Sequence, residues 1–331
     1  MPYSKPWLSY DDQLALLESR GLSITDQAAA LEYLERIGYY RLSGYWYAFR
    51  QRSGELVLLD DKGKKPKKLK CTTIALDHFK AGATFKNAVD LYVFDKRLRL
   101  LVMDALERIE IALRVDISHA LGNLDPFAYL KPELLFDEFC QQLDPRTGVT
   151  DHHSWLSKHA QLISRSKEEF VKHNKAKYGL PLPIWVVCEV WDFGTLSTLF
   201  SGMREQEQDA ISALYGVSNG RVFASWLRSL NYLRNVCAHH SRLWNRNIVD
   251  QPKLPVVAEA AWVTDFINNN HAIARCFLLL KICQHLIGII NPASTWPDKM
   301  RAQLLDFPDL SHIGLDLRSM GIINDWQNKW Q

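Results

Sequence analysis

The sequence has few cysteines, and none of them are closely paired. The six cysteines are spread over 331 residues, none in a C-x2-C motif: Cys71, Cys140, Cys188, Cys237, Cys276 and Cys283. A chain of this length buries a core without covalent cross-links. The pattern excludes a disulfide-stapled scaffold and predicts reduced thiols in a reducing compartment.

Long hydrophobic runs are also missing. The most apolar stretch, Cys276 to Ile290, is interrupted by Lys281, Gln284 and His285, so it is too short and too polar to span a bilayer. The first residues contain no apolar segment of the kind that a secretory signal needs. We therefore expect a cytoplasmic protein with no membrane partner.

Neither sign of charge dominates, and most catalytic motifs are absent. Lys and Arg number 40 against 37 Asp and Glu, a net charge of +3 that does not by itself indicate nucleic acid. The sequence has no glycine-rich phosphate loop, no H-E-x-x-H and no G-x-S-x-G. Cys237, His239 and His240 have no second ligand cluster with zinc-finger spacing, so we expect neither a metal nor a cofactor.

Two features stand out against this background, aromatic residues and one lysine cluster. The 11 Trp, 12 Tyr and 14 Phe are interpreted as core, although aromatic rings also stack on nucleobases. Six lysines form the densest positive charge: Lys62, Lys64, Lys65, Lys67, Lys68 and Lys70. Such a run is typical of a solvated loop and is also a candidate RNA-phosphate contact.

Helical periodicity predicts a mainly all-α fold. From Asp90 to about Ala120, apolar residues recur at steps of three and four, which indicates a long core helix with a Glu110–Arg114 pair. Ser9 and Asp12 form a capping-box pattern for an earlier helix that ends near Gly21. Other helices are expected at about 26–37, 154–178, 184–200, 204–214, 220–239, 270–290 and 298–305. The aromatic segment 39–50 is interpreted as a strand or a buried connector.

These elements suggest three regions. Residues 1–85 form an N-terminal helical segment with the basic loop 62–70, residues 86–290 form a helical bundle with an insertion at 122–183, and residues 291–331 form a tail. The first two helices also fit a DNA-binding helix-turn-helix, but the second is acidic where phosphates would lie.

The sequence from Leu230 to Arg246 carries the strongest chemical signal. One side is predicted to be buried, and the opposite side is polar, with Arg234, Asn235, His239, His240, Arg242 and Asn245. Asn235 and His239 share a helix face at i,i+4. Because a guanidinium holds phosphate through paired donors and histidine moves protons near neutral pH, these residues suit metal-free RNA cleavage by 2′-hydroxyl attack. The alternative is that the histidines only stabilise a helix C-terminus.

The stretch from Arg234 to Asn245 resembles the signature of bacterial Abi-like proteins of the AbiD/AbiF type, which are abortive-infection proteins of the HEPN superfamily. Other segments agree in order along the chain: Lys5–Trp7, Tyr39–Tyr45, Phe94–Arg99, Glu107–Glu110, Leu113–Arg114 and Trp191–Ser197. The resemblance runs from about residue 5 to residue 290.

This resemblance implies a HEPN helical bundle with an Arg-x4–6-His ribonuclease motif and no metal. Arg234 and His239 match the motif, with Asn235 in its usual polar position, while His240 would satisfy the longer spacing. We prefer His239 because it shares a face with Asn235. HEPN ribonucleases pair two motifs in one composite cleft, so the single motif implies a homodimer.

The function expected from sequence is thus a metal-independent endoribonuclease of phage defence or toxin–antitoxin type. Arg242 and Arg246 are expected to contact RNA, while Trp244 and Asn245 shape the cleft. Some relatives sit beside a small noncoding RNA that restrains them, and the basic loop would suit such an antitoxin RNA. The alternative is a non-catalytic RNA-binding or dimerisation module built on the same bundle.

Overall fold

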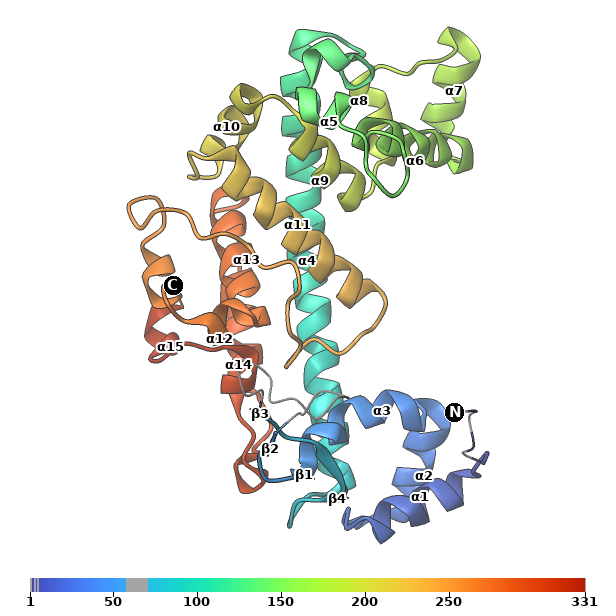
Figure 1. The fold of residues 1–331 in the computed structure, drawn as a ribbon, viewed down its shortest axis with the longest axis vertical. Helices are drawn as coiled ribbons and strands as arrows, with labels where there is room; N and C mark the ends of the chain where they lie inside the picture. Colours follow the sequence, from blue (N-terminus) through green and yellow to red (C-terminus); the bar gives the residue numbers. More distant parts are fainter. Residues whose placement is uncertain (1, 3, 5, 58–70, 331) are drawn as a thin grey trace. The chain divides into compact units, whose positions relative to one another are not determined.

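The computed structural model describes residues 2, 4, 6–57 and 71–330. In these residues helices dominate and strands are few and short, so the predicted mainly all-α fold class is confirmed (Figure 1). The first helices and the strands are α1 (Tyr10–Ser19), α2 (Gln27–Arg36), α3 (Tyr39–Trp46), β1 (Arg50–Arg52), β2 (Leu56–Val57), β3 (Cys71–Thr72) and β4 (Ala75–Phe79). The remaining helices are α4 (Phe85–Leu124), α5 (Asp137–Gln141), α6 (Asp151–Arg165), α7 (Glu169–Tyr178), α8 (Ile184–Val187), α9 (Phe193–Gly202), α10 (Glu205–Leu214), α11 (Gly220–Ala238), α12 (Asn270–Ile273), α13 (Cys276–Ile290), α14 (Trp296–Leu305) and α15 (Trp326–Lys329).

The chain forms two compact units. The first contains Met1–Arg97 and Gln303–Leu317, and the second contains Leu98–Ala302 and Arg318–Gln331. Helix α4, with 40 residues, contributes its first turns to the first unit and the remainder to the second. The basic residues from Lys62 to Lys70, predicted to contact RNA, lie outside the described residues.

The first unit begins with the predicted capped helix. The Ser9 hydroxyl accepts from the Asp12 amide at 3.1 Å and the Asp12 carboxylate accepts from the Ser9 amide, so the capping box is confirmed. Asp26 is the N-cap of α2, and its side chain accepts from the Ala29 amide at 3.0 Å. Two antiparallel strand pairs, β1 with β4 and β2 with β3, complete the described part of this unit.

The aromatic segment after α2 forms neither a strand nor a connector, so this prediction was wrong. Residues 39–46 form α3, and one turn of 3-10 helix continues to Phe49. Leu42, Tyr45, Trp46 and Phe49 are buried at the spacing i, i+3, i+4, i+7, which is one face of a helix. Because Tyr40 and Tyr47 in the same segment are aromatic but exposed, residue type alone does not reveal this period.

The second unit is organised around α11. Its predicted apolar side is confirmed, because six residues at helical spacing are buried: Phe223, Trp226, Leu227, Leu230, Leu233 and Cys237. This helix packs against α9, α10 and α13. At Gly220 the approach to α10 is so close that an added Cβ would lie 2.4 Å from the Gln208 Cβ. The start of α11 is therefore fixed by backbone contact rather than by side chains alone.

Three helices predicted as continuous are interrupted. The segment 154–178 divides into α6 and α7, 184–200 breaks before α9, and 270–290 breaks between α12 and α13. The second break follows from Asp192, whose carboxylate accepts from the Thr195 amide at 2.8 Å and starts a new helix there.

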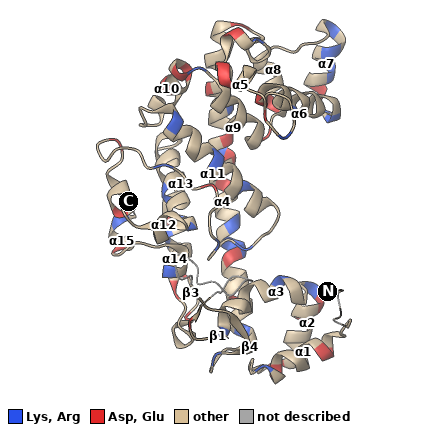
Figure 2. Cartoon of the chain, in the orientation of Figure 1, with Lys and Arg blue, Asp and Glu red and all other residues tan. Residues whose placement is uncertain are grey.

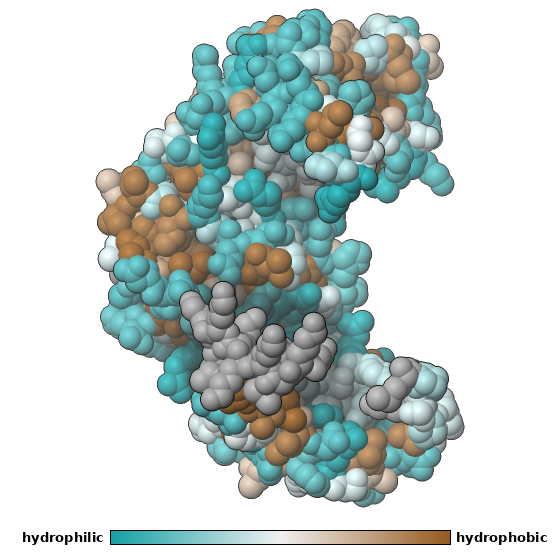
Figure 3. Space-filling view, in the orientation of Figure 1, coloured by the Kyte–Doolittle hydropathy of each residue, from teal (hydrophilic) through white to brown (hydrophobic). Residues whose placement is uncertain are grey.

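The surface and the thiols agree with the composition. No helix in the described ranges is both long enough and apolar enough to cross a membrane. The face drawn in Figure 3 is mainly hydrophilic, with separate apolar patches. None of the six cysteines, all of which lie in the described residues, forms a disulfide bond, as their spacing predicted.

Candidate active site at the end of helix α11

Arg234 lies in the penultimate turn of α11 with its side chain half-buried. Within the described part of the chain, its guanidinium forms no hydrogen bond and no ion pair. Its positive charge nevertheless acts on Glu110 of α4, so α4 and α11 bring these two side chains close together. An arginine held this way keeps its donors available for an anionic ligand.

Glu110 and Arg114 form the predicted i,i+4 pair on α4. The Arg114 Nη2 donates to Glu110 Oε1 at 3.0 Å and to the Trp191 carbonyl at 3.0 Å, and both charged side chains are mostly buried. Burial raises the pKa of Glu110, and the charges of Arg114 and Arg234 oppose that rise. Arg234 therefore helps to keep a poorly solvated carboxylate ionised.

The turn before α9 brings a second carboxylate, that of Asp192, close to Glu110. Asp192 accepts from Lys158 Nζ at 2.8 Å and from the Thr195 amide and hydroxyl. Burial favours a higher pKa for Asp192, but these hydrogen bonds outweigh it and lower the pKa. Gly194 lies against α11, since an added Cβ would be 3.2 Å from the Asn231 Oδ1.

We call Arg234, Asn231, Glu110, Arg114 and Asp192 the Arg234 cluster. They come from two helices, α4 and α11, and from the turn before α9. Figure 2 shows charges of both signs along α4, whereas the only charged residues of α11 are arginines. The sequence indicated only Arg234 as functional. Its signals for the others were the i,i+4 spacing of Glu110 and Arg114 and the presence of Glu110, Arg114 and Asp192 in segments that resemble those of Abi-like proteins.

Both histidines lie where α11 ends. His239 is the C-cap, its amide donates to the Asn235 carbonyl at 3.0 Å, and both side chains are exposed. His240 follows with φ 55°, its amide bonds to the Cys237 carbonyl, and the Ser241 amide bonds to the Val236 carbonyl at 2.9 Å. These two bonds define a Schellman motif, in which the position of His240 is usually glycine.

A histidine at this left-handed position is a poor structural choice. A side chain at positive φ costs free energy that glycine avoids. Backbone strain of this kind concentrates at functional sites. The end of α11 therefore has two exposed imidazoles, one of them on strained backbone, one turn beyond a half-buried arginine.

The segment after the histidines is firmly held. Leu243 and Trp244 are buried, Arg275 donates to the Asn245 carbonyl at 2.6 Å, and Arg99 donates to the Ser241 carbonyl at 3.3 Å. This anchoring fixes the direction in which the chain leaves the histidines.

The two arginines predicted to contact RNA lie on this segment. The Arg246 Nε donates to the Tyr232 hydroxyl at 2.7 Å and its guanidinium stacks on the same ring, while Arg242 is partly exposed. Arg246 is thus tied to α11 through Tyr232, with its contact to RNA still a prediction.

No group of three or more His, Cys, Asp or Glu side chains in the described ranges is arranged to hold a metal ion. The Arg234 cluster has two carboxylates, but each is engaged by a cation, Glu110 by Arg114 and Asp192 by Lys158. An arginine such as Arg234 can bind a phosphate, and exposed histidines can transfer protons.

Comparison with known proteins bears on this site. No curated protein and no solved structure matches the chain. A family model described as Abi-like protein matches residues 32–245, which include the second half of α2, all of α4, the turn before α9, and α11 with the segment after it as far as Asn245. The matched range contains the whole Arg234 cluster and both histidines, and it covers well over half of the chain. The chain therefore belongs to the Abi-like protein family.

Proposed function

We propose that this protein is a metal-independent endoribonuclease that acts in abortive infection or as the toxin of a toxin–antitoxin pair. The observation that carries the proposal is the pairing on one helix of a half-buried arginine, without a hydrogen-bond partner among the described residues, and exposed histidines at the helix end. Family membership supports the biological setting, because the Abi-like name denotes abortive infection.

Arg234 is proposed to bind the scissile phosphate. Its guanidinium can donate two parallel hydrogen bonds to the non-bridging oxygens, and it offsets the charge that develops on them in the transition state. Glu110 acts through Arg234, whose charge it feels in a partly buried place, and Arg114 acts through its hydrogen bond and ion pair with Glu110. We regard them as positioning residues.

His239 is proposed to move the proton. As general base it removes the proton of the 2′-hydroxyl, and the 2′-oxygen forms a bond to phosphorus while the bond to the 5′-oxygen breaks. A protonated histidine, His240 or the partner subunit's copy of His239, then gives a proton to the leaving oxygen. The products are a 2′,3′-cyclic phosphate and a 5′-hydroxyl, and Asn235 orients the imidazole or the phosphate.

The partner subunit is proposed to pack on α4. Leu100, Ile111 and Val115 are 62%, 50% and 53% exposed on one face of this helix, and exposed apolar side chains at helical spacing suit a protein interface. Ile111 and Val115 each follow a residue of the Arg234 cluster. An interface there would bring two copies of the cluster together.

The variant with Ile111→Asp and Val115→Asp is expected to be monomeric at micromolar concentration, because two carboxylates would be desolvated in the interface. Light scattering after size-exclusion chromatography measures this. The control is Leu214→Asp, which places a single carboxylate on an exposed apolar residue of α10 and should leave the dimer intact. A wild-type protein that is monomeric throughout would contradict the homodimer.

Cleavage itself is tested with purified protein and total RNA from uninfected and phage-infected cells, in EDTA. We expect new RNA ends with a 5′-hydroxyl and a 2′,3′-cyclic phosphate. We expect no cleavage of an oligonucleotide that has 2′-deoxyribose on the 5′ side of every phosphate, since the attacking hydroxyl is missing. Sequencing of 5′-hydroxyl ends locates the cuts.

Two outcomes would contradict the proposal. Ends with a 5′-phosphate, or activity lost in EDTA and restored by Mg²⁺, would indicate metal-assisted hydrolysis instead. RNA bound with steep salt dependence but never cut would indicate a non-catalytic RNA-binding module.

A further inference from the structure

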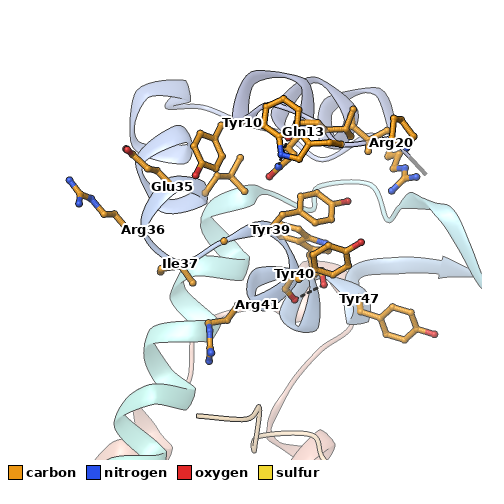
Figure 4. Close-up of a pocket in the computed structure, with 18 of the residues that line it drawn as sticks. Tyr10, Gln13, Arg20, Glu35, Arg36, Ile37, Tyr39, Tyr40, Arg41 and Tyr47 are labelled. Carbon is orange, nitrogen blue, oxygen red and sulfur yellow. Dashed lines mark hydrogen bonds between the residues drawn. The ribbon is translucent and has the colours of Figure 1, made fainter. Parts of the chain in front are cut away.

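The first unit contains a large groove, remote in sequence from α11. It has a volume of about 1270 Å³ and is lined by residues of the N-terminal segment, α1, α2, α3 and β4, among others. Small-molecule pockets usually occupy roughly 300–1,000 Å³, so this volume suits an extended ligand. In Figure 4, Tyr10 and Gln13 reach from α1 toward Tyr39 of α3, across the groove.

Aromatic rings line the groove, and several of them are exposed. Trp7 is 86% exposed, Tyr40 is 77% exposed, and Tyr10 and Tyr47 are nearly half exposed. It is unusual for several large aromatic side chains to be exposed to solvent close together, because such side chains are usually buried. Their flat faces are suited to stacking on nucleobases, and such stacking is tolerant of sequence.

The walls of the groove also contain polar atoms without a partner. Among the described residues, Trp46 Nε1, Gln13 Oε1 and Arg50 Nε are buried and form no hydrogen bond. Trp46 is only 1% exposed and lines the groove, so its indole N–H has given up water without a protein acceptor in return. Such groups call for an explanation, and a bound ligand with donors and acceptors provides one.

The charge of the groove favours an anion. Four arginines line it, Arg20, Arg36, Arg41 and Arg50, against the acids Glu35 and Asp77. Asp77 is shared by Arg20 and Arg50, at 3.9 and 3.3 Å. Arg36 and Arg41 are exposed, and in the described part of the chain Arg36 forms no ion pair. Positive charge therefore remains at the rim, next to the aromatic faces.

We infer that this groove binds single-stranded RNA, with bases stacked on Tyr40, Trp7 and their neighbours and with phosphates near Arg36 and Arg41. A proline-rich peptide would also fit aromatic faces, but it does not account for the excess of arginine. A duplex would hide its base faces and leave the rings unused. The inference does not depend on cleavage, because the groove residues are separate from Arg234 and the histidines.

The test measures fluorescence anisotropy of the full-length protein with a labelled single-stranded RNA of mixed sequence in which every ribose is 2′-O-methylated. This probe cannot be cut by 2′-hydroxyl attack, so binding is read without catalysis. Tyr40→Ala and Trp7→Ala are each expected to raise Kd on the order of tenfold, since each loses a stacked base. Tyr40→Phe keeps the ring and should bind like the wild type.

Two controls separate stacking from general effects. Tyr178→Ala removes another highly exposed tyrosine, from α7, and should leave Kd unchanged. Arg36→Gln should weaken binding and make the slope of log Kd against log salt shallower by about 0.7, the value for one phosphate contact on a single strand.

The inference is overturned if Tyr40→Ala and Trp7→Ala bind as tightly as the wild type, or if a duplex of the same sequence binds equally well. A decaproline peptide that binds the wild type but not Tyr40→Ala, with RNA binding unchanged, would assign the groove to a peptide. Because the probe cannot be cleaved, its binding does not depend on nuclease activity. If the protein binds this probe but cleaves no RNA, the proposed nuclease is refuted and this inference still holds.

Discussion

His239→Ala and Arg234→Ala should each lower the rate of RNA cleavage by about 100-fold or more, which is the usual worth of one general acid–base group or one transition-state donor. Single-turnover cleavage with enzyme in excess measures the chemical step directly. His239 is exposed at a helix end, so its removal leaves the core intact. His173→Ala, which changes an exposed histidine of α7, is the matched control and should cleave at the wild-type rate.

His240→Gly distinguishes the two histidines. Glycine is the preferred residue at φ 55°, so this variant keeps the Schellman turn and relieves its strain. If His239 is the base and His240 only assists, His240→Gly retains more activity than His239→Ala. The reverse order would assign the base to His240, and wild-type rates in both variants would refute the site.

Arg234→Lys separates the two roles of the arginine. Lysine keeps the positive charge beside Glu110, whose pKa burial already raises, but it cannot bind phosphate through two parallel donors. We expect Arg234→Lys to be as stable as the wild type and still to cleave slowly. Equal cleavage by Arg234→Lys and the wild type would mean that Arg234 serves the fold through its charge alone.

Those parts of the fold that depend on local signals were predictable. The capping box at Ser9 and the apolar spacing along α11 are properties of neighbouring residues, and the structure confirms both. In α3 the aromatic residues obscure the period, and at Asp192 the apolar pattern conceals a residue that caps a new helix. In both places the local structure depends on what a side chain contacts in the folded protein, which its residue type alone does not show.

The site was predictable only where it lies within one helix. Arg234, Asn235 and His239 are close in sequence, whereas Glu110 comes close to Arg234, and Asp192 to Glu110, only through the tertiary fold. The turn that contains Asp192 leads into α9, which packs on α11. The N-terminal groove shows the same limit. Tyr45 and Trp46 are core residues as expected, whereas Tyr40 and Tyr47 in the same segment are exposed. All four are aromatic, so the sequence alone does not show which of them line the core and which face solvent.

A further large effect is expected from pH, through a histidine behind the Asp192 turn. His159 of α6 is buried, and its Nδ1 accepts from the Trp191 indole at 3.0 Å. The rings of Tyr129, Trp155 and Trp191 pack around it. Burial lowers the pKa of His159 from 6.5 to about 4. The folded protein therefore holds this imidazole neutral, as the hydrogen bond from Trp191 requires.

The sign of the pH effect follows. Between pH 6.5 and pH 4 the unfolded chain binds a proton at this histidine and the folded chain does not, so the free energy of unfolding falls as pH falls. A shift from 6.5 to about 4 corresponds to about 3 kcal/mol over this range. Burial also lowers the pKa of the neighbouring His152, which adds to the same slope.

His159→Gln is expected to flatten this dependence, because its amide oxygen can accept from Trp191 without titrating. Urea unfolding at pH 7 and pH 5 measures it, with His173→Gln as the exposed control that should keep the wild-type slope. Trp191 donates to His159 and is followed by Asp192, the residue that caps α9. Protonation of His159 would break the hydrogen bond from Trp191 and so disturb the turn that contains Asp192. This turn leads into α9, whose Gly194 packs against Asn231 of the Arg234 cluster. Acid should therefore weaken cleavage and stability together in the wild type and less so in His159→Gln. An equal slope in both proteins would show that His159 is not the titrating group.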